Sequence, residues 1–377
     1  MSIKYMPKRI KVIGLMSGTS LDGVDAAIIE TDGERILSFG PARTLEYSDA
    51  ERTVLSESMA AAVNWNFTGP PPNIFSRAEA LIDATHRRAV AGLMEASGLG
   101  KDDIDLVGYH GQTVLHRGAT PKRKGESLQI GSGEGLAAAT GLPVVFDFRS
   151  ADVAAGGQGA PLAPIYHKAL CDYSGLTGRI AVVNIGGVSN VTLINGDAPL
   201  IAGDCGPGNG PLDSWVKAKS GKDYDAGGAL SLSGKVDFDL IACWLTAPFF
   251  MRPLPRSADR YEFDVLGDLA GISTEDGAAT LAGFTAQAIA RDMANFDPQT
   301  VIICGGGRHN RAIIYMLQSH CGGNVVSADT LGWDGDALEA QAFAYMAART
   351  LCGLPLSFPG TTGTPEPMGG GVLASPK

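Results

Sequence analysis

The chain has 377 residues, 45% of them hydrophobic, and a formal net charge of −10 at pH 7. This length exceeds that of most single cores and predicts two lobes, and the acidic balance disfavours a nucleic-acid surface. No segment supplies the ~20 uninterrupted apolar residues of a membrane span, and the scattered cysteines lack a Cys-x-x-Cys pair, so we expect a soluble cytoplasmic protein with reduced thiols and no membrane partner.

The first predicted strand covers residues 10–13 and runs into a turn, Gly14-Leu-Met-Ser-Gly-Thr-Ser-Leu-Asp-Gly-Val-Asp25. Backbone N–H groups and hydroxyls in such a turn bind anions, and its two carboxylates suit a metal ion that accompanies a phosphate. Because residues 26–31 also resemble a strand, an ordinary β-hairpin accounts for the same pattern. The turn alone leaves both interpretations open.

The rest of the first half alternates helices and strands, which predicts an α/β lobe. In chain order we expect a helix over 78–95, a strand over 105–109, a helix over 134–140, a strand over 144–148 and a helix over 160–170. The strand at 105–109 ends in His110-Gly-Gln-Thr113. Polar residues at the end of a buried strand are candidates for ligand contact.

The pattern then starts again with a second strand, turn and strand. The expected elements are strands over 180–185 and 191–194 around a Gly186-Gly187 turn, a strand near 201, helices from 212 and over 278–293, a strand over 301–304 and a helix over 337–351. We therefore expect two similar α/β lobes, lobe I over 1–175 and lobe II over 176–352, with a tail over 353–377 that packs back on a lobe.

Turns placed after strands point to one phosphate ligand. They are residues 17–25, Asn184-Ile-Gly-Gly-Val-Ser-Asn190, Gly203-Asp-Cys-Gly-Pro-Gly-Asn209 and Cys304-Gly-Gly-Gly307. No P-loop pattern is present and no Gly-x-Gly-x-x-Gly follows a strand, so those two classes lose support. The remaining two-lobed phosphate binders are of the sugar kinase, Hsp70 and actin type, with two RNase H-like lobes and an interlobe active-site cleft.

Within that class the chain resembles the anhydro-N-acetylmuramic acid kinase family. The motifs that carry the resemblance are residues 14–25, His110-Gly-Gln-Thr113, Asp147-Phe-Arg-Ser-Ala-Asp-Val-Ala-Ala-Gly-Gly-Gln-Gly-Ala-Pro-Leu162, Asn184-Ile-Gly-Gly187, Asp204-Cys-Gly-Pro-Gly-Asn209, Cys304-Gly-Gly-Gly307 and Leu338-Glu-Ala-Gln-Ala-Phe-Ala344. They span nearly the whole chain in the family's order. One segment departs, because Arg256-Ser-Ala-Asp-Arg-Tyr261 stands where the family tends to have Lys-Ser-Thr-Gly-Arg-Glu, and this bears on sugar preference.

The resemblance implies a reaction of peptidoglycan recycling that uses ATP and water. The 1,6-anhydro ring of anhydro-N-acetylmuramic acid is opened and O6 is phosphorylated, giving N-acetylmuramic acid 6-phosphate and ADP. It also implies a Mg²⁺ ion and a homodimer. A kinase of a hexose or another amino sugar is the rival enzyme, and a non-catalytic sugar or nucleotide sensor on the same fold is the rival from another class.

For the catalytic base we select Asp204, which matches the family's catalytic aspartate and lies where a strand enters a Gly-Pro-Gly loop. The alternative is a carboxylate that caps loop amides in an Asx-turn. The expected sugar-side residues are His110, Arg149 and Glu339, and His110 could instead act as an alternative base. Their alternatives are a satisfied core histidine, an ion pair of Arg149 with Asp147 or Asp152, and compensation of a helix N-terminus by Glu339.

The expected ATP contacts come from both lobes. In lobe I they are Gly18, Thr19, Ser20, Leu21, Asp22, Gly23, Val24 and Asp25, and in lobe II they are Asn184, Gly186, Gly187, Gly305 and Gly306. Asp22 or Asp25 would orient Mg²⁺ through water, with an exposed hairpin acid as the alternative for either. For the lobe II glycines the alternative is tight packing of a turn against a helix.

Overall fold

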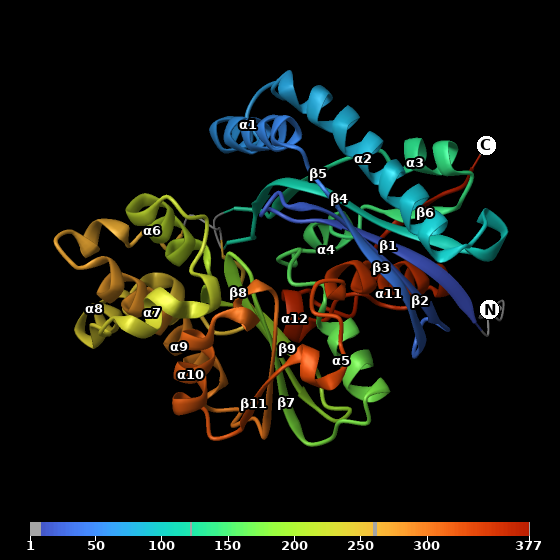
Figure 1. The fold of residues 1–377 in the computed structure, drawn as a ribbon. Coiled ribbons are helices and arrows are strands. Elements are labelled where there is room, and N and C mark those ends of the chain that lie inside the picture. Colours follow the sequence, from blue (N-terminus) through green and yellow to red (C-terminus); the bar gives the residue numbers. More distant parts are fainter. Residues whose placement is uncertain (1–8, 121–122, 259–261, 377) are drawn as a thin grey trace. The chain divides into compact units, whose positions relative to one another are not determined.

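The computed structural model describes residues 9–120, 123–258 and 262–376. The described chain divides into two compact units, each built on one β-sheet (Figure 1). Unit 1 is formed within residues 1–175, 336–359 and 363–377, and unit 2 within 176–335 and 360–362.

The sheet of unit 1 has the strand order β12-β6-β4-β1-β2-β3, with β5 paired to β4. Its strands are β1 (Ile10–Ser17), β2 (Gly23–Thr31), β3 (Ile36–Glu46), β4 (Leu106–Arg117), β5 (Glu126–Ile130), β6 (Val144–Phe146) and β12 (Val372–Ala374). Strand β1 pairs antiparallel with β2 and parallel with β4, and β4 pairs parallel with β6. The alternating side chains of β2 show that the sheet is covered on both faces, because Ala26 and Ile28 join one buried cluster and Ala27 joins another.

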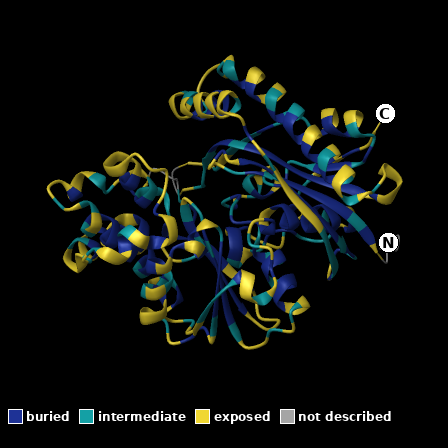
Figure 2. Ribbon diagram, viewed as in Figure 1, coloured by how far each residue is buried: buried dark blue, intermediate teal, exposed yellow. Residues whose placement is uncertain are grey.

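Helices of unit 1 form these two covers. They are α1 (Asp49–Trp65), α2 (Ile74–Ser97), α3 (Gly133–Thr140), α4 (Ser150–Ala154), α5 (Pro164–Tyr173) and α11 (Leu338–Cys352). Helix α2 contributes Ile82 and Leu93 to the cluster that includes Ile28, whereas Ala340 of α11 packs with Ala27. The opposite face of α2 carries exposed side chains, as Figure 2 shows.

Unit 2 has the strand order β11-β10-β7-β8-β9. The strands are β7 (Arg179–Ile185), β8 (Val188–Asn195), β9 (Ile201–Pro207), β10 (Thr300–Cys304) and β11 (Asn324–Ser327), and the helices are α6 (Gly210–Ser220), α7 (Ala229–Ser233), α8 (Phe238–Trp244), α9 (Thr274–Met293) and α10 (Arg311–His320). The short α12 (Pro359–Thr362) includes the C-terminal residues that group with unit 2. A core of side chains from these strands and from α6, α8, α9 and α10 holds the unit together.

The two units repeat one topology. In unit 1 the order β3-β2-β1-β4-β6 has two antiparallel pairs followed by two parallel pairs, and β9-β8-β7-β10-β11 repeats that order and those directions in unit 2. The predicted fold class, α/β with two RNase H-like lobes, is therefore confirmed for each unit. The strand-turn-strand repeat that the sequence showed at residues 10–31 and 180–194 corresponds to β1-β2 and β7-β8.

In the C-terminal part of the chain, the boundary between the units differs from the expected one after residue 352. Helix α11, expected in lobe II, belongs to unit 1 and packs on β1, β2 and β4. A methyl group at Gly14 would lie 1.8 Å from the carbonyl oxygen of Ala340, and one at Gly108 would lie 2.2 Å from that of Phe343. The helix thus approaches the sheet backbone at two glycines that are distant from it in sequence, which is why its position along the chain suggested the wrong lobe.

Candidate functional site

Three candidate segments of unit 1 follow adjacent parallel strands. Strand β4 pairs parallel with both β1 and β6, so the carboxyl ends of the three strands lie at one edge of the sheet. The turn over 18–22 follows β1, His110 lies within β4 beyond its parallel pairing with β6, and Arg149 follows β6. This is the edge at which α/β sheets bind ligands.

The turn after β1 is the tip of a β-hairpin, since β1 and β2 pair antiparallel from Ile10 with Thr31 to Met16 with Asp25. Thr19, Ser20 and Asp22 are exposed at the tip, whereas Gly18 and Asp25 are half-buried. The other predicted contacts of this turn, Leu21, Gly23 and Val24, are buried. The hairpin interpretation is therefore correct for the backbone, and the tip still offers hydroxyls and a carboxylate to a ligand.

A buried polar network holds the base of this turn. The Ser17 hydroxyl lies 2.7 Å from the Tyr47 hydroxyl and donates to Oε1 of Gln112 at 2.6 Å. The Gln112 amide in turn donates to the carbonyl oxygen of Gly18 at 3.3 Å. Burial raises the pKa of Tyr47 to about 12, so its hydroxyl remains protonated. Sequence reasoning assigned no role to Tyr47 or Gln112, although Gln112 belongs to the motif that follows the strand at 105–109.

The acids of the turn differ in their surroundings. The Asp25 carboxylate accepts a 2.6 Å hydrogen bond from the Thr44 hydroxyl of β3, whereas Asp22 is at the exposed tip. The described part of the chain brings no three His, Cys, Asp or Glu side chains together as a metal cluster. One or two carboxylates fit Mg²⁺ that keeps most of its waters, rather than a metal enclosed by protein ligands.

His110 lies at a β-bulge of β4. Leu15 pairs with Tyr109 but Ser17 pairs with Gln112, so β4 has one more residue than β1 over this stretch. The extra length includes Gly111, whose φ of +71° and whose close approach to the carbonyl oxygen of Ile130 both require glycine. Bulges of this kind redirect side chains and occur often beside active sites.

The bulge directs His110 to Arg149. Nδ1 of His110 lies 2.9 Å from the carbonyl oxygen of Gly111, and Nη2 of Arg149 lies 3.1 Å from Nε2. Because a carbonyl only accepts and a guanidinium only donates, the proton is on Nδ1 and Nε2 accepts from Arg149. Burial, and then the charge of Arg149, hold the pKa of His110 well below its usual value, and its ring packs on Phe343 with centroids 4.5 Å apart.

These contacts favour the alternative of a satisfied buried histidine over a second catalytic base, because both ring nitrogens have protein partners. His110 thus accepts a hydrogen bond from Arg149. Nη1 of Arg149 also donates to the carbonyl oxygen of Gly159 at 2.7 Å. Of the two acids expected as ion-pair partners of Arg149, Asp147 accepts from the Ser150 hydroxyl and amide, and Asp152 accepts from the Gly159 amide. His110 and Arg149 are thus brought together.

Glu339 lies in the first turn of α11 and shares this electrostatic environment. Its pKa is raised, first by desolvation and then by the charge of Asp25, and the charge of Arg149 opposes both. The side chain nevertheless retains exposed surface. The hairpin acid, the arginine and Glu339 therefore interact within unit 1, although they come from three separate parts of the chain.

In unit 2 two glycine turns lie side by side, because β7 and β10 are parallel neighbours and Cys304 pairs with Asn184. A methyl group at Gly305, whose φ is +72°, would lie 2.3 Å from Oδ1 of Asn184. The turn at Gly186 and Gly187 is bonded to the segment that enters α6, since the Gly208 and Gly210 amides donate to the Gly187 carbonyl and the Asn209 amide to that of Gly186. Packing thus accounts for part of this glycine content, while Gly187 and Gly306 are exposed.

Asp204 is on β9 and is 9% exposed. Here too the sheet contains a bulge, because Ser189 of β8 pairs with Gly206 and Asn190 pairs with Asp204, which leaves Cys205 as an extra residue. The Asp204 carboxylate accepts a 2.7 Å hydrogen bond from the amide of Ala258. This donor is 54 positions away along the chain, whereas the Asx-turn alternative concerned amides of the local loop. Residues 259–261, which include part of the segment that departs from the family pattern, lie outside the described residues.

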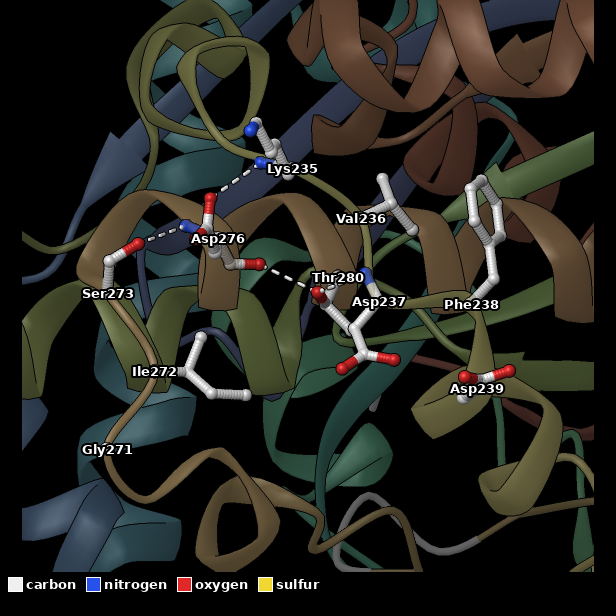
Figure 3. A pocket seen from close by; sticks show the side chains of 10 residues that line it. All are labelled: Lys235, Val236, Asp237, Phe238, Asp239, Gly271, Ile272, Ser273, Asp276 and Thr280. Atoms are coloured by element: carbon white, nitrogen blue, oxygen red, sulfur yellow. Dashed lines mark hydrogen bonds between the residues drawn. The ribbon is translucent and has the colours of Figure 1, made fainter.

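One cavity of unit 2, about 660 Å³ in volume, contains none of the predicted site residues. Figure 3 shows that the side chains of Ser273, Asp276 and Thr280 in this cavity form hydrogen bonds within the fold. Asp276 accepts from the Lys235 amide at 2.7 Å, and the Thr280 hydroxyl accepts from the Asp237 amide at 3.0 Å. A second cavity, about 490 Å³, is lined by Arg256 and Asp292, near the segment that contacts Asp204.

Within the described ranges we find no helix with the length and apolar content that a bilayer crossing requires. A sequence profile described as anhydro-N-acetylmuramic acid kinase matches residues 10–375. Relatives with that description include one from Mesorhizobium japonicum, 47% identical over 369 residues, and one from Nitrobacter winogradskyi, 50% identical over 369 residues. Each of these alignments covers 97% of this chain and 99% of the relative.

Among solved structures, a ROK family glucokinase from Streptomyces griseus in complex with glucose and AMPPNP has a TM-score of 0.40 at 16% identity, over 89% of this chain and 99% of that one. This similarity is too low to inform function.

Proposed function

The chain belongs to the anhydro-N-acetylmuramic acid kinase family, and from this membership we propose how its residues divide the reaction. ATP and water convert 1,6-anhydro-N-acetylmuramic acid to N-acetylmuramic acid 6-phosphate and ADP. A bond forms between the water oxygen and C1 while the C1–O6 bond breaks, and O6 then bonds to the γ-phosphorus as ADP leaves. The single observation that carries the assignment of residues is the buried Asp204 carboxylate at the bulge of β9.

Asp204 is the proposed general base. It takes a proton from the attacking water, and the proton later passes to solvent. The Ala258 amide fixes one carboxylate oxygen, which orients the group before substrate binds. A positioned base of this kind contributes about 100-fold to about 10,000-fold in rate.

The hairpin tip is the proposed contact for the ATP phosphates. Its exposed Thr19 and Ser20 supply hydroxyl donors, and the backbone of residues 18–25 supplies amides. Mg²⁺ would be held through water by Asp22 or Asp25, where it neutralises phosphate charge. Phosphoryl transfer depends mainly on such positioning and charge stabilisation.

The glycine turns of unit 2 are proposed to contact the nucleotide as well. Asn184 and the glycines at 186, 187, 305 and 306 follow adjacent parallel strands, which supports this assignment. Gly305 and Asn184 pack closely against each other, and this contact fixes the spacing of the two turns.

On the sugar side, Arg149 is the proposed partner of the lactyl carboxylate or of a phosphate, because its planar guanidinium suits bidentate contacts with either group. His110 accepts from that guanidinium and holds its orientation. Glu339, whose pKa is affected by the charges of Asp25 and Arg149, is proposed to contact the sugar. The homodimer and the cytoplasmic location are proposals that the family resemblance supports.

The test is to incubate the purified chain with ATP, Mg²⁺ and 1,6-anhydro-N-acetylmuramic acid and to identify products by mass spectrometry. The proposal predicts equimolar ADP and N-acetylmuramic acid 6-phosphate. N-acetylglucosamine and glucose serve as comparison substrates for the rival kinase. Turnover of those sugars alone would contradict the proposal, and so would binding of the anhydrosugar without turnover by folded protein.

A further inference from the structure

The segment over residues 254–258 runs beside β9 at Asp204. The Asp204 amide donates to the carbonyl oxygen of Arg256 at 2.9 Å, and the Ala258 amide donates to Oδ2 of Asp204 at 2.7 Å. The approach is close, because a methyl group at Gly203 would lie 2.9 Å from the carbonyl oxygen of Arg256 and 2.7 Å from the Leu254 side chain. Both the backbone and the carboxylate of Asp204 are thus fixed by this segment.

The Arg256 side chain anchors the segment to the interior of unit 2. It is 4% exposed and forms an ion pair with Asp292 of α9, with Nη2 2.5 Å from Oδ2. Nη1 donates to the carbonyl oxygen of Arg252 at 2.5 Å, and the guanidinium lies 4.6 Å from the ring centroid of Phe249. Nη2 also donates to the carbonyl oxygen of Cys205 at 3.3 Å.

These contacts connect α9 to both sides of Asp204. The Arg256 side chain donates to the carbonyl oxygen of Cys205, which is the extra residue of the bulge. The backbone carbonyl of Arg256 accepts from the Asp204 amide. Asp292 is buried with its partner and has only 9% of its side chain exposed. Breaking such a largely buried pair is costly, because removal of one partner leaves the other charge uncompensated.

We propose that Arg256, through its buried ion pair with Asp292, is a positioning residue for the Asp204 carboxylate, in a role that rests on the proposed function of Asp204 as base. Without the pair the 254–258 segment is no longer anchored to α9, and the Ala258 amide no longer fixes the carboxylate. Misplacing a catalytic group by about 1 Å costs on the order of 100-fold in rate. The effect falls on kcat, because no ATP contact is assigned to this segment.

Arginine suits this position because its planar guanidinium can donate to several acceptors at once. The guanidinium bonds Asp292 and two carbonyl oxygens while it stacks on Phe249. Lysine carries one compact charge, so it keeps the attraction to Asp292 but not this set of directed bonds. We therefore expect Arg256→Lys to lose less activity than Arg256→Met but to remain less active than the wild type.

The experiment compares Arg256→Lys, Arg256→Met and Asp292→Asn with the wild type in the product assay. We expect kcat to fall by about 100-fold in Arg256→Met and Asp292→Asn and by about 10-fold in Arg256→Lys, with KM for ATP within about 2-fold. The acidic limb of the kcat/KM profile should move to higher pH, because loss of the Ala258 amide removes a bond that favours the ionised base. Asp297→Asn, which breaks the exposed pair with Arg179 in the same unit, is the matched control.

Unpaired buried charges can unfold a variant, so the double variant Arg256→Met/Asp292→Leu removes both charges together. If folded protein of this variant or of Asp292→Asn keeps wild-type kcat and the wild-type pH profile, the positioning role is wrong. The positioning role is also wrong if the variants lose activity only because a smaller fraction of the protein is folded. The proposed function fails separately, when the wild-type chain gives no product or when Asp204→Asn is fully active.

Discussion

At the scale of single residues, two polar side chains that the sequence singled out have different uses. His110 is neutral and has both ring nitrogens bonded, so it supports Arg149 and does not exchange protons with a substrate. The Asp204 carboxylate accepts a hydrogen bond from the Ala258 amide, and the residue lies at a bulge. The chemistry we assign therefore depends on Asp204 as the proton acceptor.

Asp204→Asn keeps the size of the side chain and removes its basicity. We expect kcat to fall by about 100-fold to about 10,000-fold with little change in melting temperature. Steady-state kinetics of product formation measure this, and Asp239→Asn, at an exposed acid of the same unit, is the control. Turnover of Asp204→Asn near that of the control would remove the base assignment.

The turn residues and Asp204 could be selected from sequence because each belongs to a short glycine-containing motif in or directly after a predicted strand. Their supporting residues could not. Ser17 and Gln112 are 95 positions apart, and Arg256 and Asp292 are 36 apart. A single sequence contains no signal for such side-chain pairs, because only the folded sheet and α9 bring the partners together.

At the scale of elements, the β1-β2 hairpin depends on the network below its tip. Tyr47→Phe removes the hydroxyl that contacts Ser17 but keeps the ring in the core. Loss of one net hydrogen bond is worth about 1 kcal/mol, so we expect KM for ATP to rise about 5-fold. Tyr315→Phe, at a side chain that is 71% exposed, should leave KM unchanged. An unaltered KM in Tyr47→Phe would show that the tip does not need this support.

The packing of α11 on β1 gives a second prediction. Gly14→Ala places a methyl group 1.8 Å from the carbonyl oxygen of Ala340, so the helix must move away from the sheet. Overpacking of this kind costs about 1–3 kcal/mol or more, and urea unfolding should show it as a lower midpoint. Gly369→Ala in the same unit is the control, because its added methyl group meets no atom within 4 Å. Equal midpoints for the two variants would contradict the close packing.

The sequence predicted most of the buried strands but missed several peripheral elements. Helix α1 had a detectable signal, since Ser48 and Glu51 form a capping box at its start. Strand β3 was harder, because its second half is largely exposed and lacks a continuous apolar pattern. The helix expected over 160–170 begins at Pro164 instead, where proline suits the first turn.

At the scale of the whole molecule, four histidines with lowered pKa values are concentrated in unit 1, of which His86, His110 and His167 are buried and His116 is half-buried. Burial lowers the pKa of His86, His116 and His167 to about 4, and that of His110 is well below its usual value. Unfolded histidines titrate near pH 6.5. Between these values the unfolded chain binds more protons than the native chain, so stability is complete above pH 6.5 and is lost as pH falls toward the native pKa values.

Each such histidine contributes up to about 1.4 kcal/mol per pH unit within this window. We therefore expect the melting temperature of unit 1 to fall between about pH 7.5 and about pH 5.5. Differential scanning calorimetry at the two pH values measures the shift. A melting temperature that stays constant or rises on acidification would contradict the neutral, buried state of these side chains.

The repeated topology was predictable because both halves of the sequence contain the same strand-turn-strand opening. The place of α11 was not predictable, since the chain completes unit 2 before this helix returns to unit 1. The contact between the helix and Gly14 joins residues more than 300 positions apart. The close approach of backbones at Gly14 and Gly108 identifies the sheet to which the helix belongs.

In the proposed reaction, water opens the anhydro ring while O6 takes the γ-phosphate. A short reaction of the chain with ATP and 1,6-anhydro-N-acetylmuramic acid in ¹⁸O-labelled water, followed by mass spectrometry with fragment assignment, tests this directly. We expect N-acetylmuramic acid 6-phosphate with one solvent oxygen at C1 and none in the transferred phosphate. A phosphorylated product that retains the anhydro ring, or a 6-phosphate without label at C1, would contradict it.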